Sequence, residues 1–160
     1  MAVHELPRIR WDERAGPARN ARRELPALAA AWFAYVRETL ASNPPLAGLH
    51  PVRLATKRLR YTLELFRPCY GPGLDVRLEA LRQVQQALGD LNDSVASRAL
   101  LQASMPRSAQ GAHVNHFLDH RAHRQAGQFR KSWSEVFDAP GREPWFTGYL
   151  SRRARAPRSC

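Results

Sequence analysis

The residues best suited to chemistry lie in one short segment, HPVRLATKRLRYTLELFR, at positions 50–67. On a helix that turns by about 100° per residue, one side of this segment is mostly basic. That side carries His50, Arg53, Lys57 and Arg60, together with the acid Glu64. A row of cations about 15 Å long matches the repeat of an extended phosphate chain better than it matches one small anion. The spacing therefore predicts a binding face for a polyanion.

The opposite side of the same segment is apolar, and we expect it to be buried. Its members are Val52, Leu59, Leu63 and Phe66. An ordinary solvated face is the alternative interpretation of the basic row, although such faces usually mix positive and negative charges. The row repels itself, and Glu64 offsets only part of that repulsion. A bound polyanion would offset the rest.

Overall composition points the same way. The chain of 160 residues has 25 Lys and Arg against 14 Asp and Glu, and its formal net charge is +11. Almost all of the basic residues are arginines, whose planar guanidinium can bridge two phosphate oxygens. This excess predicts a phosphate-rich partner, either nucleic acid, polyphosphate or an anionic membrane surface. An Arg-rich genome is the alternative explanation for the large number of basic residues, but it does not explain their positions along the chain.

No apolar run approaches the roughly 18–20 residues that a membrane span needs. The first residues, MAVHELPRIRWDE, lack the apolar core of a signal peptide, so we expect a cytoplasmic protein. Two cysteines suggest neither a disulfide framework nor a metal cluster.

Helical periodicity dominates the rest of the chain, and no strand alternation is visible. We expect helices over residues 20–41, over 49–67, over about 30 residues from Leu74, and after a turn at 104–108. The last of these carries the stripe Leu118, Ala122, Phe129, Trp133 and Phe137. The predicted fold is an all-α antiparallel four-helix bundle. Its predicted divisions are an irregular basic arm (1–20), the bundle (21–140) and an Arg-rich C-terminal tail (141–160).

Four histidines follow one flank of the fourth expected helix: His113, His116, His120 and His123. A pair one turn apart can chelate Zn²⁺ or Ni²⁺, but nothing nearby in the sequence completes a tetrahedral set. We prefer the interpretation that this flank adds pH-dependent positive charge for a phosphate ligand. His120, Arg124 and Lys131 are then auxiliary binding residues. Asp90 and Asp93 are expected to pair with arginines of a neighbouring helix rather than to bind metal.

Three motifs resemble those of the CHAD family, the conserved histidine α-helical domain. HPVRLATKRLRYTLELF (50–66) resembles its first signature and LRQVQQALGDLND (81–93) its second, while FLDHR (117–121) and FRKSW (129–133) resemble its final helix. The resemblance spans about residues 25–137. It implies a helical domain that binds inorganic polyphosphate in a central basic groove and is often associated with polyphosphate granules. Carried over by position, the binding residues are His50, Arg53, Lys57, Arg58 and Arg60, although Arg58 points elsewhere on the helical wheel.

One departure from the family is that its domain usually contains two similar halves, each with a histidine-plus-basic helix. This chain has one such helix and resembles the C-terminal half. Either two chains pair as a homodimer that rebuilds the groove, or the chain is a truncated product with weaker binding.

Catalysis is not expected. No nucleophile–base pair and no Gly-rich phosphate loop is visible, and the Glu-x-Glu-x-Lys motif of the triphosphate-cleaving domain that often accompanies this family is absent. Phosphate chemistry normally needs acidic residues to hold Mg²⁺, and the basic face has one carboxylate, Glu64. The sequence thus predicts binding without turnover and without a cofactor. The alternatives are a nucleic-acid-binding helical protein, or a metal-binding protein that uses the histidine flank.

Overall fold

Proline marks the start of the main helices. The computed structural model describes residues 6–105 and 107–156, and most of them are helical. Three helices carry proline in the first turn, where the N–H that proline lacks would have no intrahelical acceptor. The elements are α1 (Pro17–Ala41), the 3₁₀ turn η1 (Leu46–Leu49), α2 (His50–Leu65), the 3₁₀ turn η2 (Arg67–Cys69), α3 (Pro72–Ser104), α4 (Ala109–Ser132), the π-helical turn η3 (Trp133–Phe137) and α5 (Arg142–Arg152).

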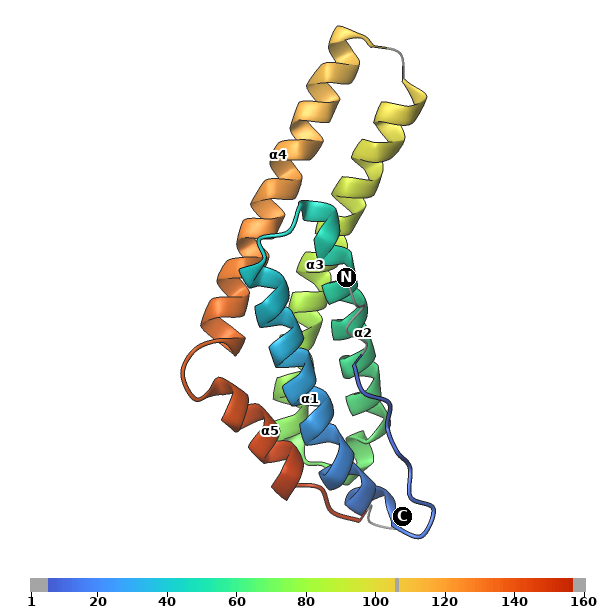
Figure 1. Ribbon diagram of the computed structural model, residues 1–160, viewed down its shortest axis with the longest axis vertical. Coiled ribbons are helices and arrows are strands. Elements are labelled where there is room, and N and C mark those ends of the chain that lie inside the picture. The colour runs from blue at the N-terminus through green and yellow to red at the C-terminus, as the bar shows by residue number, and fades with distance from the viewer. Residues whose placement is uncertain (1–5, 106, 157–160) are drawn as a thin grey trace.

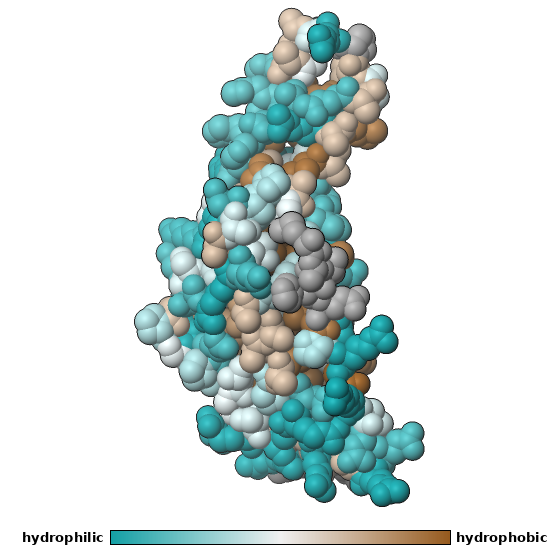
Figure 2. Space-filling view, viewed as in Figure 1, coloured by the Kyte–Doolittle hydropathy of each residue, from teal (hydrophilic) through white to brown (hydrophobic). Residues whose placement is uncertain are grey.

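The first four helices run alternately up and down (Figure 1). α3 packs against both α2 and α4, and α5 packs against α1. Because α3 has 33 residues and α4 has 24, the ends of these two helices extend past α1 and α2 as a projecting hairpin (Figure 1). Figure 2 shows apolar atoms exposed among polar ones along this hairpin.

Aromatic side chains from α1, η3 and α5 fill the centre of the core. Trp32 is fully buried, and its ring centroid lies 5.3 Å from that of Trp133 and 5.1 Å from that of Phe137. Its indole Nε1 donates a hydrogen bond of 3.0 Å to the hydroxyl of Thr56 on α2. The core therefore fixes α2 to α1 by a directional contact as well as by apolar packing, and this orients the outer side of α2.

The prediction of an all-α bundle is confirmed, and the predicted Arg-rich C-terminal tail over 141–160 contains a fifth helix that the sequence did not predict. This helix is α5, in which Phe146 and Leu150 are buried, and Ala154 just beyond it is buried as well. This stripe is short and arginines surround it, so its helical period is weak in the sequence. Residues 157–160 of that predicted tail lie outside the described residues. Among the helices described, none combines the length and apolarity needed to cross a membrane.

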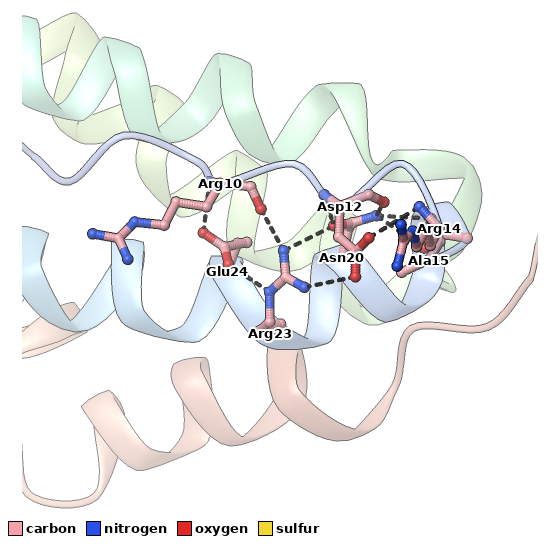
Figure 3. Close-up of polar contacts among 8 residues, drawn as sticks. Arg10, Asp12, Arg14, Ala15, Asn20, Arg23 and Glu24 are labelled. Carbon is pink, nitrogen blue, oxygen red and sulfur yellow. Dashed lines mark hydrogen bonds and ion pairs between the residues drawn. The ribbon is translucent and has the colours of Figure 1, made fainter.

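The predicted N-terminal arm is non-helical over 6–16, and it is fixed along the first half of α1 (Figure 3). The backbone N–H of Arg10 donates to Glu24 Oε2 at 2.9 Å, and Arg23 donates to the carbonyl of Arg10. Buried Asn20 accepts from the N–H of Asp12 at 2.9 Å and donates to carbonyls of the arm. Helix α1 begins at Pro17, three residues before the predicted start. Residues 1–5 of the predicted arm lie outside the described residues.

Candidate anion-binding groove

Helix α2 has one buried side and one open side, as the sequence predicts. The expected stripe of Val52, Leu59, Leu63 and Phe66 is buried throughout. Thr56, which the sequence analysis did not include, is buried in the same stripe through its bond to Trp32. Since this side faces the core, the basic side of α2 turns away from it.

A groove of about 400 Å³ lies between α2 and α3. Two of the predicted binding residues, Arg53 and Arg60, line it from α2. The α3 wall was not predicted, and it adds a third arginine, two glutamines, a glycine and two aspartates. The α3 residues are Arg82, Gln85, Gln86, Gly89, Asp90 and Asp93.

Arg53 differs from the other two arginines of the groove because it has no carboxylate partner among the described residues. Its Nε is buried and has no hydrogen-bond partner, and within the described part of the chain its guanidinium makes no ion pair. The Nε lies 3.7 Å from the place that a Cβ would take on Gly89, so the Arg53 side chain packs over this glycine of α3. A buried guanidinium nitrogen without an acceptor is unfavourable, and a bound oxyanion would satisfy it.

Arg60, by contrast, is already paired. Its Nε donates to Gln85 Oε1 at 2.8 Å, its Nη1 donates to Glu64 Oε1 at 2.6 Å, and its Cζ lies 4.4 Å from the ring centroid of Tyr61. Glu64 Oε1 also accepts from Arg82 at 3.3 Å. One carboxylate thus holds two arginines at this end of the groove, so they form a rigid, partly neutralised cluster.

His50 and Lys57 lie on the same side of α2, beside the residues that line the groove. His50 is exposed, and its Nδ1 lies 2.8 Å from Asn92 Oδ1. This contact with Asn92 orients the imidazole between α2 and α3. The Lys57 ammonium lies 5.5 Å from the ring centroid of Tyr61, and it has no carboxylate partner within the described residues.

A comparison with known protein families matches residues 3–102 to the CHAD domain. The chain belongs to the CHAD family. The matched residues include the arm, the basic side of α2 and the α3 wall of the groove, and with them the first two motifs of the sequence analysis. The third motif, at 117–133, lies beyond the match. Searches of curated proteins and of solved structures gave no match.

Arg58 belongs to the CHAD motif by position but does not line the groove. Its Nη1 donates to the carbonyl of Leu6 at 2.6 Å, and its Nη2 donates to that of Pro7 at 3.0 Å. Arg58 points away from the basic row, as the helical wheel predicts, and it contacts the N-terminal arm. We therefore assign Arg58 to fixing the arm and leave it out of the proposed binding site.

The acidic residues of the CHAD groove differ from their expected role. Asp90 and Asp93 were expected to pair with arginines of a neighbouring helix, and among the described residues neither forms an ion pair, so this expectation is wrong. Asp90 instead accepts from Gln86 Nε2 at 2.8 Å within α3. Both aspartates line the groove and lower its positive potential on the α3 side.

The histidine flank lies on α4, outside the CHAD match. Ala122, Gln125 and Phe129 form the buried side of α4, and the predicted auxiliary residues are exposed and do not line the groove. The exposed residues are His113, His116, His120, His123, Arg124 and Lys131. In the described part of the chain, no three His, Cys, Asp or Glu residues come together as a metal site. On a helical wheel Asp119 points away from the histidine flank, yet its carboxylate lies 3.4 Å from His123 Nδ1.

Proposed function

We propose that this protein binds inorganic polyphosphate along the basic side of α2 and the groove beside it, without chemical turnover. The observation that carries the proposal is Arg53, whose guanidinium lines the groove with a buried, unsatisfied Nε. Membership of the CHAD family, which is associated with polyphosphate binding, supports the same ligand.

The arrangement of charges suggests how the polymer lies. His50, Arg53 and Lys57 follow one side of α2 over about 10 Å, whereas Asp90 and Asp93 lie on the α3 wall. The aspartates repel phosphate, so the polymer runs along the α2 side of the groove. Arg60 and Arg82 contribute less, because Glu64 already neutralises part of their charge.

Binding to nucleic acid is the competing function, and the lining of the groove argues against it. Single-stranded nucleic acid is usually held by stacking of its bases on aromatic rings. No aromatic residue is found among the described residues that line the groove; Tyr61, which lies outside that lining and is 45% exposed, has the Arg60 guanidinium over its ring at 4.4 Å. We therefore assign the ligand to a phosphate chain without bases.

Binding without turnover is also part of the proposal. The groove holds more carboxylates than the sequence predicts, because Asp90 and Asp93 line it. These two are accompanied by three arginines, and the described residues offer no third acidic or histidine ligand for a Mg²⁺ ion there. Such a lining suits the holding of phosphate oxygens more than their activation by metal.

The partner we propose for the chain itself is a second copy. The chain has one basic helix where the CHAD family usually has two, and its projecting hairpin exposes four large apolar side chains. These are Leu100, Met105, Val114 and Phe117. Two hairpins pairing about a twofold axis would bury them. We also propose that the protein resides in the cytoplasm in association with polyphosphate granules, as its resemblance to the CHAD family implies.

Competition tests the ligand class. Long-chain polyphosphate labelled with a fluorophore is bound to the protein at about 150 mM salt, and unlabelled polyphosphate or duplex DNA is added at equal phosphate concentration. We expect unlabelled polyphosphate to displace the label and DNA to leave most of it bound. Equal displacement by DNA would assign the face to general polyanion binding instead. In a parallel sample with Mg²⁺, release of orthophosphate above the protein-free rate would contradict binding without turnover.

A further inference from the structure

A second pocket is lined by segments that lie at the end of the bundle far from the projecting hairpin, and Figure 1 shows where these segments are. Its volume is about 720 Å³, within the range of roughly 300–1,000 Å³ that is typical of small-molecule sites. The turn between η2 and α3, helix α5 and residues 153–156 form its walls. The pocket shares no lining residue with the groove, although its Pro68–Arg77 part lies within the CHAD match and its α5 part lies outside it.

A buried arginine without an acidic partner lines this pocket. The residue Arg77 is only 4% exposed, and its Cζ lies 3.6 Å from the ring centroid of Trp145 and 4.0 Å from that of Tyr149. Its two terminal nitrogens donate to the carbonyls of Gly73 and Trp145, each at 2.7 Å, while its Nε is buried without a partner. Burial lowers the pKa of Arg77 to about 10. Its positive charge is therefore uncompensated by any carboxylate of the described chain.

The rest of the lining adds positive charge and no negative charge. Arg153 and Arg155 are exposed at this pocket, and among its described lining residues there is no Asp or Glu. The groove between α2 and α3 also has three arginines, but it has two aspartates as well. The second pocket is thus the more cationic of the two, and an anion there meets no carboxylate.

The walls of the pocket are held in place by close packing. A Cβ on Gly73 would lie 2.5 Å from the ring of Tyr149, so only glycine allows this ring to rest on the first turn of α3. The Tyr149 hydroxyl donates to the carbonyl of Gly71 at 3.1 Å, and the ring stacks on Tyr70 with centroids 5.6 Å apart. A pocket that is already formed loses little entropy when a ligand binds.

We propose that this pocket binds a small phosphate-bearing anion, at a site independent of the polyphosphate groove. Arg153 and Arg155 contact the phosphate oxygens, since exposed guanidinium groups can bridge two of them. Arg77 acts through its buried charge and keeps Trp145 and Tyr149 in place. Two kinds of ligand carry this phosphate group, a free inorganic phosphate and a nucleotide.

Isothermal titration calorimetry with pyrophosphate and, separately, with adenosine monophosphate tests the proposal on the full chain. The variant is Arg153→Ala/Arg155→Ala, which keeps the fold because the contacts of these residues with Tyr149 and Cys69 use backbone N–H groups. The control is Arg19→Ala/Arg121→Ala, which removes the same charge from exposed residues that line neither site. A groove variant, Arg53→Gln/Lys57→Gln, completes the set.

We expect affinity to fall at least tenfold in the pocket variant and to stay within twofold in the control variant, and in the groove variant the loss should be smaller than in the pocket variant. Binding of pyrophosphate shows that the phosphate group suffices, and binding of adenosine monophosphate alone assigns the site to phosphates that carry a ring. The proposal is overturned if neither ligand binds the unmodified protein, or if the control variant loses as much affinity as the pocket variant.

Discussion

The Nε of Arg53 lies 3.7 Å from the position that a Cβ would occupy on Gly89, so a side chain of α2 rests directly over the glycine of α3. Both residues line the groove, and the proposed binding depends most on Arg53. Their contact also gives a way to change the groove without touching a charged group.

Substitutions at Gly89 should separate helix stability from access to the groove. The Cβ of Gly89→Ala would make an ordinary van der Waals contact with Arg53, and alanine favours an interior helical position by about 1 kcal/mol over glycine. Urea unfolding should therefore show a small gain in stability, with polyphosphate affinity within about threefold. Gly89→Leu should fold as well but should displace Arg53 and weaken binding more than tenfold. Equal affinity in the two variants would mean that the polymer does not enter the groove.

Arg58 and Lys57 are neighbours on α2 with the same charge, but their substitution should have different effects on polyphosphate affinity and on protection of the N-terminal arm. Arg58 donates to two carbonyls of the N-terminal arm, whereas Lys57 lies on the open side of the helix. Arg58→Met should make the arm more sensitive to limited proteolysis and leave polyphosphate affinity within about twofold. Lys57→Met should do the reverse, with intact arm protection and affinity reduced several-fold. A loss of binding in the Arg58 variant that equals the loss in the Lys57 variant would return Arg58 to the binding site.

The attachment of the arm should depend on pH through Glu24. The N–H of Arg10 and the guanidinium of Arg23 hold the pKa of this carboxyl below its ordinary value of 4.5. A carboxyl with a lowered pKa stabilises the fold above its ordinary value, and this contribution disappears as the pH falls through the lowered pKa. After correction for intrinsic rates, hydrogen exchange at the Arg10 amide should therefore accelerate only below about pH 4.5. In Glu24→Gln, which does not titrate, that acceleration should be absent.

The hydrogen bond between Trp32 and Thr56 should contribute measurably to stability. Trp32 is fully buried, so Thr56→Val leaves its indole N–H without an acceptor, at a cost of about 1–3 kcal/mol. Thr56→Ser keeps the acceptor and serves as the control. Urea unfolding should show the larger loss in the valine variant, and a larger loss in the serine variant would assign the effect to packing of the methyl group.

Self-association should depend on the projecting hairpin. Leu100 and Phe117 are 69% and 57% exposed, and no other described element covers them. If two copies pair there, Leu100→Glu/Phe117→Glu should shift the mass from dimer to monomer in size-exclusion chromatography with light scattering. Circular dichroism should stay unchanged, because both side chains lie outside the core. A monomeric unmodified protein, with or without polyphosphate, would rule out this pairing.

Residues within one helix could be placed from the sequence, and residues brought together from two helices could not. The 3.6-residue period placed Val52, Leu59 and Leu63 in the core, and with them the basic side of α2 away from it. The period of a helix says nothing about the register of its neighbour, so Arg82 and the two aspartates of the groove were missed or misassigned. Likewise, the wheel showed that Arg58 points away from the row but not that two carbonyls of the arm lie beside it.

The fifth helix and the second pocket show the same limit. The apolar stripe of α5 consists of little more than Phe146 and Leu150, too few positions to establish a period in an Arg-rich stretch. The sequence alone does not distinguish Arg77 from an arginine on the surface. Only the packing of α5 against the start of α3 reveals that it is buried between two rings.

The central claim is most directly tested by polyphosphate binding to Arg53→Glu/Lys57→Glu, with Arg19→Glu/Arg121→Glu as a control of equal charge change. Fluorescence anisotropy is measured at several salt concentrations, and circular dichroism verifies the helix content of each variant. The variant Arg53→Gln/Lys57→Gln removes the same two charges without adding carboxylates, so its loss of affinity cannot come from repulsion between a new carboxylate and the aspartates of the groove. We predict at least a 100-fold loss of polyphosphate affinity for the charge-reversal variant, a smaller loss for the glutamine variant, and little change for the control. In both groove variants, the slope of log affinity against log salt concentration should be reduced by about two. Affinity that falls equally in the reversal and in the control would contradict the account, because net charge rather than the side of α2 would then govern binding.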